Sequence, residues 1–183
     1  MVNRAIEELV VSKFGDDKWD AIKAKAGVDV DVFISNEGYP DEMTYRLVEA
    51  ASQVLGLPAD DVLVAFGEHW VLETAQKGYG GMMAAGGRTL AEFLTNLANF
   101  HTRVVMVLPK LQPPHFECSD VTERSLRLHY HTHRGGLTSF VVGLLSGLGK
   151  MYRTPVRVSV AQRKGAGADH DIFDVEWDGV QPA

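Results

Sequence analysis

A row of three hydrogen-bond donors stands in this 183-residue chain at Tyr130, Thr132 and Arg134. The alternation over residues 126–134 predicts a β-strand that runs into a Gly-Gly turn. Side chains on a strand alternate between two faces, so these three point the same way, about 7 Å apart per step of two residues. A phenol, a hydroxyl and a guanidinium can all donate hydrogen bonds, the guanidinium as a bidentate fork. Such a row suits a ligand with carboxylates or phosphates, although an exposed polar strand face is the simpler interpretation.

A single histidine, His101, interrupts an apolar helical stripe. The apolar residues over 90–108 repeat mostly at three and four positions, which predicts an amphipathic helix that begins after Thr89. A histidine in such a stripe is more often a satisfied core residue than a ligand. A buried imidazole must still find partners for its ring nitrogens, and a metal is one such partner.

The opposite face of the same strand carries His129, His131 and His133. These side chains could chelate a metal, but structural zinc requires four ligands in a closed geometry, so we expect this face to be exposed to solvent. The single cysteine, Cys118, excludes an intramolecular disulfide and fits a reducing cytosol. No nucleophile with a paired base, phosphate loop or acid pair is visible, so the sequence indicates no enzyme.

The elements that must position these residues divide the chain into two halves. Helical periodicity predicts helices over 2–14, 16–26, 40–56 and 58–78. The five glycines of 78–87 predict a loop around a short helical piece. The second half contains predicted strands over 115–119, 124–134, 156–162 and 172–177, and a helix over 137–152. The predicted class is α+β, with a helical subdomain of about residues 1–60 packed on a subdomain of about residues 61–183 that combines helices with a four-stranded antiparallel sheet.

Composition excludes several classes of protein. The net charge of −6 makes nucleic acid and anionic membranes poor partners. No run of 18 apolar residues is present, so we expect no membrane span. The N-terminus carries acids and is typical of an amphipathic helix rather than a signal peptide, which predicts a cytoplasmic location.

Together, His101, Pro114 and the Tyr-x-Thr-x-Arg row resemble the heme nitric oxide/oxygen-binding (H-NOX) family. The chain closely resembles the stand-alone bacterial members of this family, which also includes the heme domain of soluble guanylate cyclase. The family motif Tyr-x-Ser-x-Arg stands here as Tyr130-His131-Thr132-His133-Arg134. The resemblance covers essentially the whole chain, 1–183, as one domain. It includes Ala65-Phe66-Gly67, Pro113-Pro114, Gly143-Leu144-Leu145 and the Gly-Ala-Asp-His of 167–170.

The resemblance implies a b-type heme held between the helical and the α/β subdomains. His101 would be the proximal iron ligand, while Tyr130, Thr132 and Arg134 would bind the heme propionates. Thr132 replaces the usual Ser but keeps the hydroxyl. Ala98 stands where the family commonly has Asp, which removes a carboxylate near the proximal histidine and would change the packing or the tuning of the iron–histidine bond.

The same alignment implies a set of residues around the heme. These are Val2, Ile6, Phe66, Trp70, Phe140, Leu144 and Leu145 on the distal side or heme wall, with Pro114 pressing on the heme. Oxygen-binding relatives carry a distal Tyr three residues before the helix Gly, where this chain has Phe140 before Gly143. Bound dioxygen is favoured by a nearby hydrogen-bond donor, so the resemblance implies a sensor of nitric oxide and carbon monoxide. The alternative is an oxygen-binding heme protein with the Trp70 indole as distal donor.

The resemblance also implies an output through another protein. Similar stand-alone proteins act with histidine kinases or cyclic-di-nucleotide enzymes, and the expected signal is a conformational change passed to such a partner. We expect the chain itself to be a monomer.

Overall fold

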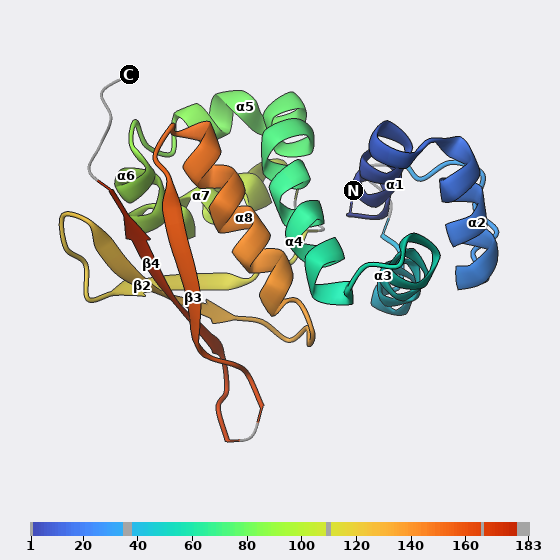
Figure 1. The fold of residues 1–183 in the computed structure, drawn as a ribbon. Helices are drawn as coiled ribbons and strands as arrows, with labels where there is room; N and C mark the ends of the chain where they lie inside the picture. Colours follow the sequence, from blue (N-terminus) through green and yellow to red (C-terminus); the bar gives the residue numbers. More distant parts are fainter. Residues whose placement is uncertain (1, 35–37, 109–110, 166, 179–183) are drawn as a thin grey trace.

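The structure is a computed structural model that describes residues 2–34, 38–108, 111–165 and 167–178 (Figure 1). Its helices are α1 (Val2–Phe14), α2 (Asp16–Ala26), α3 (Asp41–Leu55), α4 (Ala59–His69), the π-helical segment η1 (Trp70–Ala75), α5 (Gln76–Ala84), α6 (Leu90–Thr95), α7 (Leu97–Val107) and α8 (Thr138–Met151). Its strands are β1 (His115–Ser119), β2 (Ser125–His131), β3 (Val156–Gln162) and β4 (Asp171–Trp177). The predicted α+β class is confirmed.

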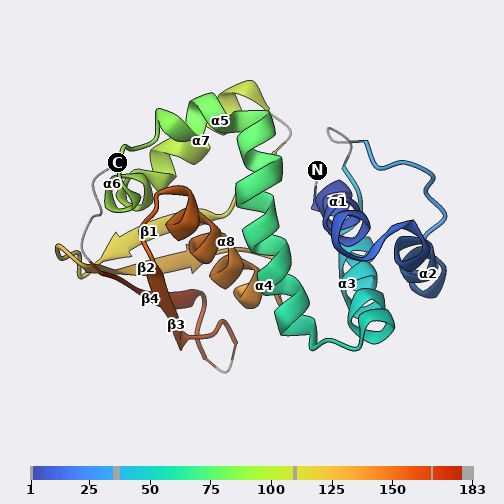
Figure 2. The ribbon, with the colours of Figure 1, turned by 45° about the horizontal axis from the view of Figure 1, so that its top comes forward.

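The four strands form one antiparallel sheet in the order β1-β2-β4-β3. Helices α1 to α3 lie apart from this sheet, with α4 and α8 between them in both views (Figures 1 and 2). In the register of β2, Tyr130 lies opposite Phe116 of β1 and Asp171 of β4. The motif therefore begins on an inner strand of the sheet, where both neighbours fix its position.

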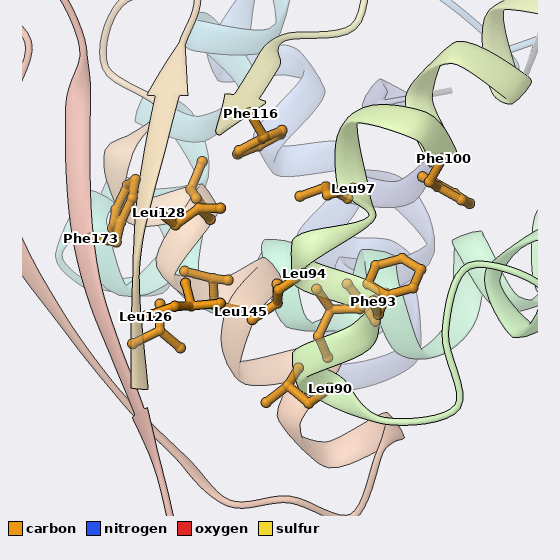
Figure 3. Close-up of a cluster of buried hydrophobic side chains, with 14 of the residues drawn as sticks. Leu90, Phe93, Leu94, Leu97, Phe100, Phe116, Leu126, Leu128, Leu145 and Phe173 are labelled. Atoms are coloured by element: carbon orange, nitrogen blue, oxygen red, sulfur yellow. The ribbon is translucent and has the colours of Figure 1, made fainter. Parts of the chain in front are cut away.

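Two hydrophobic cores result from this division. One core packs α1, α2, α3 and the first part of α4, and includes Ile6 and Phe66. The other packs α6, α7 and α8 on the sheet, and Figure 3 shows side chains such as Leu94, Leu128 and Phe173 converging there. Trp70 packs against both cores, so the start of η1 joins the two parts of the molecule.

Helices α4 and α8 touch through glycines. A Cβ built on Gly143 would lie 2.1 Å from the carbonyl oxygen of Val64, and one built on Gly67 would lie 2.2 Å from that of Phe140. Only a residue without a side chain permits this backbone approach. The two helices that flank the boundary between the cores are therefore fixed to each other by direct backbone packing.

The predicted helix boundaries are wrong at two places. The helix expected to end near Gly78 continues through η1 and α5 to Ala84, with a kink at Tyr79 (φ −138°, ψ 15°). The helical piece expected within 78–87 therefore exists, but it is joined to the preceding helix and not set inside a loop. The helix expected over 90–108 is broken at Asn96 (φ −97°, ψ 7°). The Asn96 side chain donates to the Gly86 carbonyl at 2.8 Å, which supports the break from the preceding loop.

The strand expected over 124–134 is also too long, because β2 ends at His131. Thr132 and Arg134 therefore lie in the loop that precedes α8, and strand alternation does not place them. The Thr132 side chain shapes this loop instead, since its Oγ1 accepts a hydrogen bond from the Arg134 backbone N–H at 3.1 Å.

Candidate functional site

His101 lies on α7 in a sparsely polar environment. Its ring packs against Phe116, with centroids 5.5 Å apart, and against Phe100 at 5.7 Å. Its Nδ1 atom is buried and makes no hydrogen bond to any part of the chain that the structure describes. A buried nitrogen without a partner is costly, so this atom is a sign of a missing interaction.

The environment keeps the His101 imidazole neutral. Burial, together with the nearby His115, lowers the pKa of His101 to about 4, against a smaller raising effect of the Pro114 carbonyl. A neutral imidazole is the form that ligates metals. The side chain thus has the protonation state of an iron ligand at neutral pH.

A cavity of about 410 Å³ opens beside His101. It is lined by Ala98, Thr102, Val105, Met106, Pro113, Pro114 and His115 in addition to His101. Ala98 contributes only a methyl group at the position where the H-NOX family commonly has Asp, so no carboxylate from that position reaches the imidazole. Pro114, which the resemblance places against the heme, lines the same cavity.

The three motif residues lie together even though two of them leave the strand. Tyr130 is buried, and its aromatic ring stacks near Phe116 at 5.1 Å, which continues the ring contacts from His101. Burial raises the pKa of Tyr130, and its hydrogen bond with the Thr132 hydroxyl and the charge of Arg134 partly offset this. The phenol, hydroxyl and guanidinium therefore form one polar group next to the ring cluster of His101 and Phe116.

Two residues of α3 meet this group, and sequence analysis missed both. Arg134 Nε lies 3.0 Å from Asp41 Oδ2, an ion pair whose alignment does not make a hydrogen bond. Tyr45 donates its hydroxyl to the Gly135 carbonyl at 2.9 Å. About ninety positions separate the partners in the chain, and no local pattern could have signalled the contacts. They join the helical part to the motif loop.

Most of the predicted distal residues gather at the boundary of the two cores. Phe66 and Phe140 pack with ring centroids 4.8 Å apart, and Ile6 is buried in the same core. Trp70 and Leu144 are half-buried beside the other core. This wall is apolar apart from the Trp70 indole.

Two predicted members of that wall stand apart. The side chain of Val2 lies outside the described part of the chain. Leu145 is 2% exposed and points into the sheet-side core among Leu94 and Leu126 (Figure 3). Its position is that of a core residue.

The histidines on the outer face of β2 are not simply exposed, which corrects one prediction. His129 Nε2 lies 2.9 Å from Ser119 Oγ, and His129 Nδ1 lies 2.9 Å from His170 Nε2. His131 stacks on His170 with centroids 4.1 Å apart, whereas His133 is exposed as expected. Within residues 2–34, 38–108, 111–165 and 167–178, no three His, Cys, Asp or Glu side chains are arranged to hold a metal ion.

The geometry agrees with the comparisons with known proteins. The family model described as Haem-NO-binding matches residues 1–160. The chain belongs to this family, the H-NOX domains. They are heme domains that sense nitric oxide or dioxygen, as in soluble guanylate cyclase.

Curated relatives include soluble guanylate cyclase gcy-37 of Caenorhabditis elegans, which is 30% identical over 182 residues. The alignment covers 94% of this chain but 26% of the cyclase, so the H-NOX chain spans about a quarter of that relative. The H-NOX domain is the sensor part of such proteins, and their cyclase activity comes from other domains.

Solved H-NOX structures share the fold. An H-NOX protein from S. oneidensis in the Fe(II)NO ligation state gives a TM-score of 0.86 at 21% identity, covering 97% of this chain and 98% of that one. An unliganded Fe(II) H-NOX protein from K. algicida gives 0.83 at 20% identity, covering 97% and 95%. No helix in the described ranges of this chain is long and apolar enough to cross a membrane.

Proposed function

We propose that this H-NOX domain binds a b-type heme through His101 and senses nitric oxide and carbon monoxide. It would pass a conformational change to a separate protein, such as a histidine kinase or a cyclic-di-nucleotide enzyme. The observation that carries the proposal is the neutral, partly buried imidazole of His101, whose buried Nδ1 atom has no hydrogen-bond partner in the described chain and which lies beside a cavity. A bound heme would supply an iron that could bind the His101 imidazole and a diatomic gas.

The polar group formed by the motif fits the other end of such a ligand. Propionates are carboxylates, and Tyr130, Thr132 and Arg134 offer a phenol, a hydroxyl and a guanidinium from one place. Hydrogen bonds to charged groups are the stronger ones in proteins. Ile6, Phe66 and Phe140 form an apolar wall that suits the porphyrin and excludes water.

The role of His101 is tested by replacing it. The His101→Ala protein should lose the Soret band of the wild-type protein, and added imidazole should restore it because the free base can occupy the vacated space. His133→Ala, which removes an exposed histidine, is the matched control and should keep the wild-type spectrum. Wild-type ferrous and carbonyl spectra in the His101→Ala protein would refute the assignment.

The preference for nitric oxide over dioxygen rests on Phe140. Its ring packs on Phe66 and offers no hydrogen-bond donor to a polar gas. The ferrous protein should therefore change its spectrum with nitric oxide and carbon monoxide but form no stable complex in air. Phe140→Tyr should add oxygen affinity if a phenol at this position reaches the gas.

The competing function is oxygen binding with the indole of Trp70 as donor. Trp70 is favoured for this by its half-buried position between the two cores. A stable complex of the wild-type protein in air, lost in Trp70→Phe, would establish that function instead.

A further inference from the structure

The turn between β3 and β4 is built to reach the motif loop. Gly165 and Ala168 exchange backbone hydrogen bonds of 2.9 and 3.0 Å, which closes the turn tightly. Gly165 and Gly167 have φ values of 112° and 99°, a region that favours glycine. Lys164, just before this closure, and His170, just after it, are therefore held in defined positions.

Both residues contact the end of β2 and the start of the motif loop, His170 at His131 and Lys164 at Thr132. The Lys164 ammonium donates to the Thr132 carbonyl. His170 stacks on His131, the residue before, with ring centroids 4.1 Å apart. The Gln162 side chain fixes His170 in turn, donating to its carbonyl at 3.0 Å.

A buried carboxylate ties the same turn to the far end of the loop. The Lys164 backbone N–H donates to Asp171 Oδ1 at 2.6 Å, and the other oxygen of Asp171 accepts from Thr138 Oγ1 at 3.0 Å. Thr138 is the first residue of α8, where the motif loop ends. The turn thus holds residues 132–137 at both ends.

The charges around the loop give Lys164 a second role. Arg134 is paired with Asp41, and Asp171 is a buried carboxylate whose charge acts on Tyr130. Without another cation, two propionates would meet a site in which the acids outnumber the bases. The ammonium of Lys164 comes from the turn between β3 and β4 and donates to the loop carbonyl of Thr132, so its charge offsets this excess of acids.

We propose that Lys164 is a positioning residue for propionate binding, which fixes the Thr132–Arg134 loop and supplies its second positive charge. The inference rests on the proposed heme function and extends it to a residue outside the Tyr-x-Thr-x-Arg motif. Lys164 is exposed, so its contribution is that of a solvent-accessible charged group.

Heme release measures the charge effect. Lys164→Met should release iron protoporphyrin IX about 3- to 10-fold faster than the wild type, while Lys164→Arg should restore most of the loss. Arg163→Met, one residue away on the same turn and also exposed, is the matched control and should be unchanged. With the dimethyl ester of the same heme, which lacks the propionate charges, the effect of Lys164→Met should shrink to less than about 2-fold.

Amide hydrogen exchange in the heme-free protein measures how firmly the Thr132–Arg134 loop is held. The Arg134 amide, which donates to Thr132 Oγ1, should exchange with deuterium about 3- to 10-fold faster in Lys164→Met and remain protected in Arg163→Met. Equal acceleration with both hemes, or an unchanged Arg134 amide, would overturn the proposal. If the wild type binds neither heme, the proposed function fails, and the amide measurement still decides whether Lys164 holds the loop.

Discussion

Arg134 has a carboxylate partner within the protein, Asp41, in addition to any ligand. The ion pair is half-exposed on both sides, with 38% and 36% of the side chains accessible, so water screens it. A propionate that makes a better-aligned bidentate contact can therefore compete for the guanidinium. In the proposed function, heme binding and the contact between α3 and the motif loop would therefore depend on the same side chain, that of Arg134.

Replacing Arg134 should weaken heme binding. Arg134→Ala removes a charge-assisted contact, and the expected cost is about 1.5–3 kcal/mol of heme affinity. Transfer of heme to an acceptor protein measures this as a faster release rate. Arg127→Ala is the control, because Arg127 pairs with Asp174 on the outer face of the sheet at 2.9 Å. The prediction fails if both variants release heme at the wild-type rate.

His69 should make stability depend on pH. Burial lowers the pKa of His69 from 6.5, against smaller raising effects of Glu73 and Glu8. The folded state thus prefers neutral imidazole, and its free energy of unfolding should fall as the pH drops below about 6.5. In His69→Gln, urea unfolding at pH 7 and pH 5 should differ less than in the wild type, whereas exposed His133→Gln should resemble the wild type. An identical pH dependence in all three proteins would contradict the assignment.

The sequence predicted the types of the site residues better than it predicted how those residues are arranged in space. Strand alternation placed Tyr130 correctly on β2, but Thr132 and Arg134 reach the same place through a loop held by local hydrogen bonds. Asp41 and Lys164 could not be found, because their contacts join positions far apart in the chain. His131 looked exposed because alternation alone does not show that the turn before β4 covers it with His170.

The packing of α4 against α8 should be sensitive to a single added methyl group, because glycines bring the two backbones into contact. Gly143→Ala would place a Cβ 2.1 Å from the Val64 carbonyl, so the backbones must separate. The expected loss is about 1–3 kcal/mol of unfolding free energy in urea titration. Gly81→Ala, at an open position of α5, should instead gain up to about 1 kcal/mol because alanine favours helix. Equal effects of the two substitutions would show that the close approach is not rigid.

The segment that follows α4 shows where glycine content alone misjudges secondary structure. Five glycines over 78–87 predicted a loop around a short helical piece. The helix instead continues from α4 to Ala84, because η1 and α5 pack against the sheet-side core through Val71 and Met83. Tertiary packing outweighs the low helix propensity of glycine. The π-helical segment that begins at Trp70 had no signal in the sequence, although such segments often accompany functional sites.

The described residues form two cores, which meet where α4 packs on α8 and where Trp70 contacts both. Heme-free protein should therefore unfold in a transition whose calorimetric enthalpy exceeds its van't Hoff enthalpy. Bound heme contacts both parts in the proposed function, so it should raise the melting temperature and bring the two enthalpies together. Scanning calorimetry with and without heme makes the comparison. A ratio of one in the heme-free protein would show that the cores already unfold as a single unit.

The sheet has two outer strands, β1 and β3. The length and regularity of these strands determine how easily a second molecule could add a strand to the sheet. An open strand edge is a template on which another chain can add. Here β1 is only five residues long, and the pairing of β3 with β4 shifts register between Val160 and Gln162. Short and irregular edges resist strand addition, so concentrated protein should scatter light as separate molecules and form no fibres on standing.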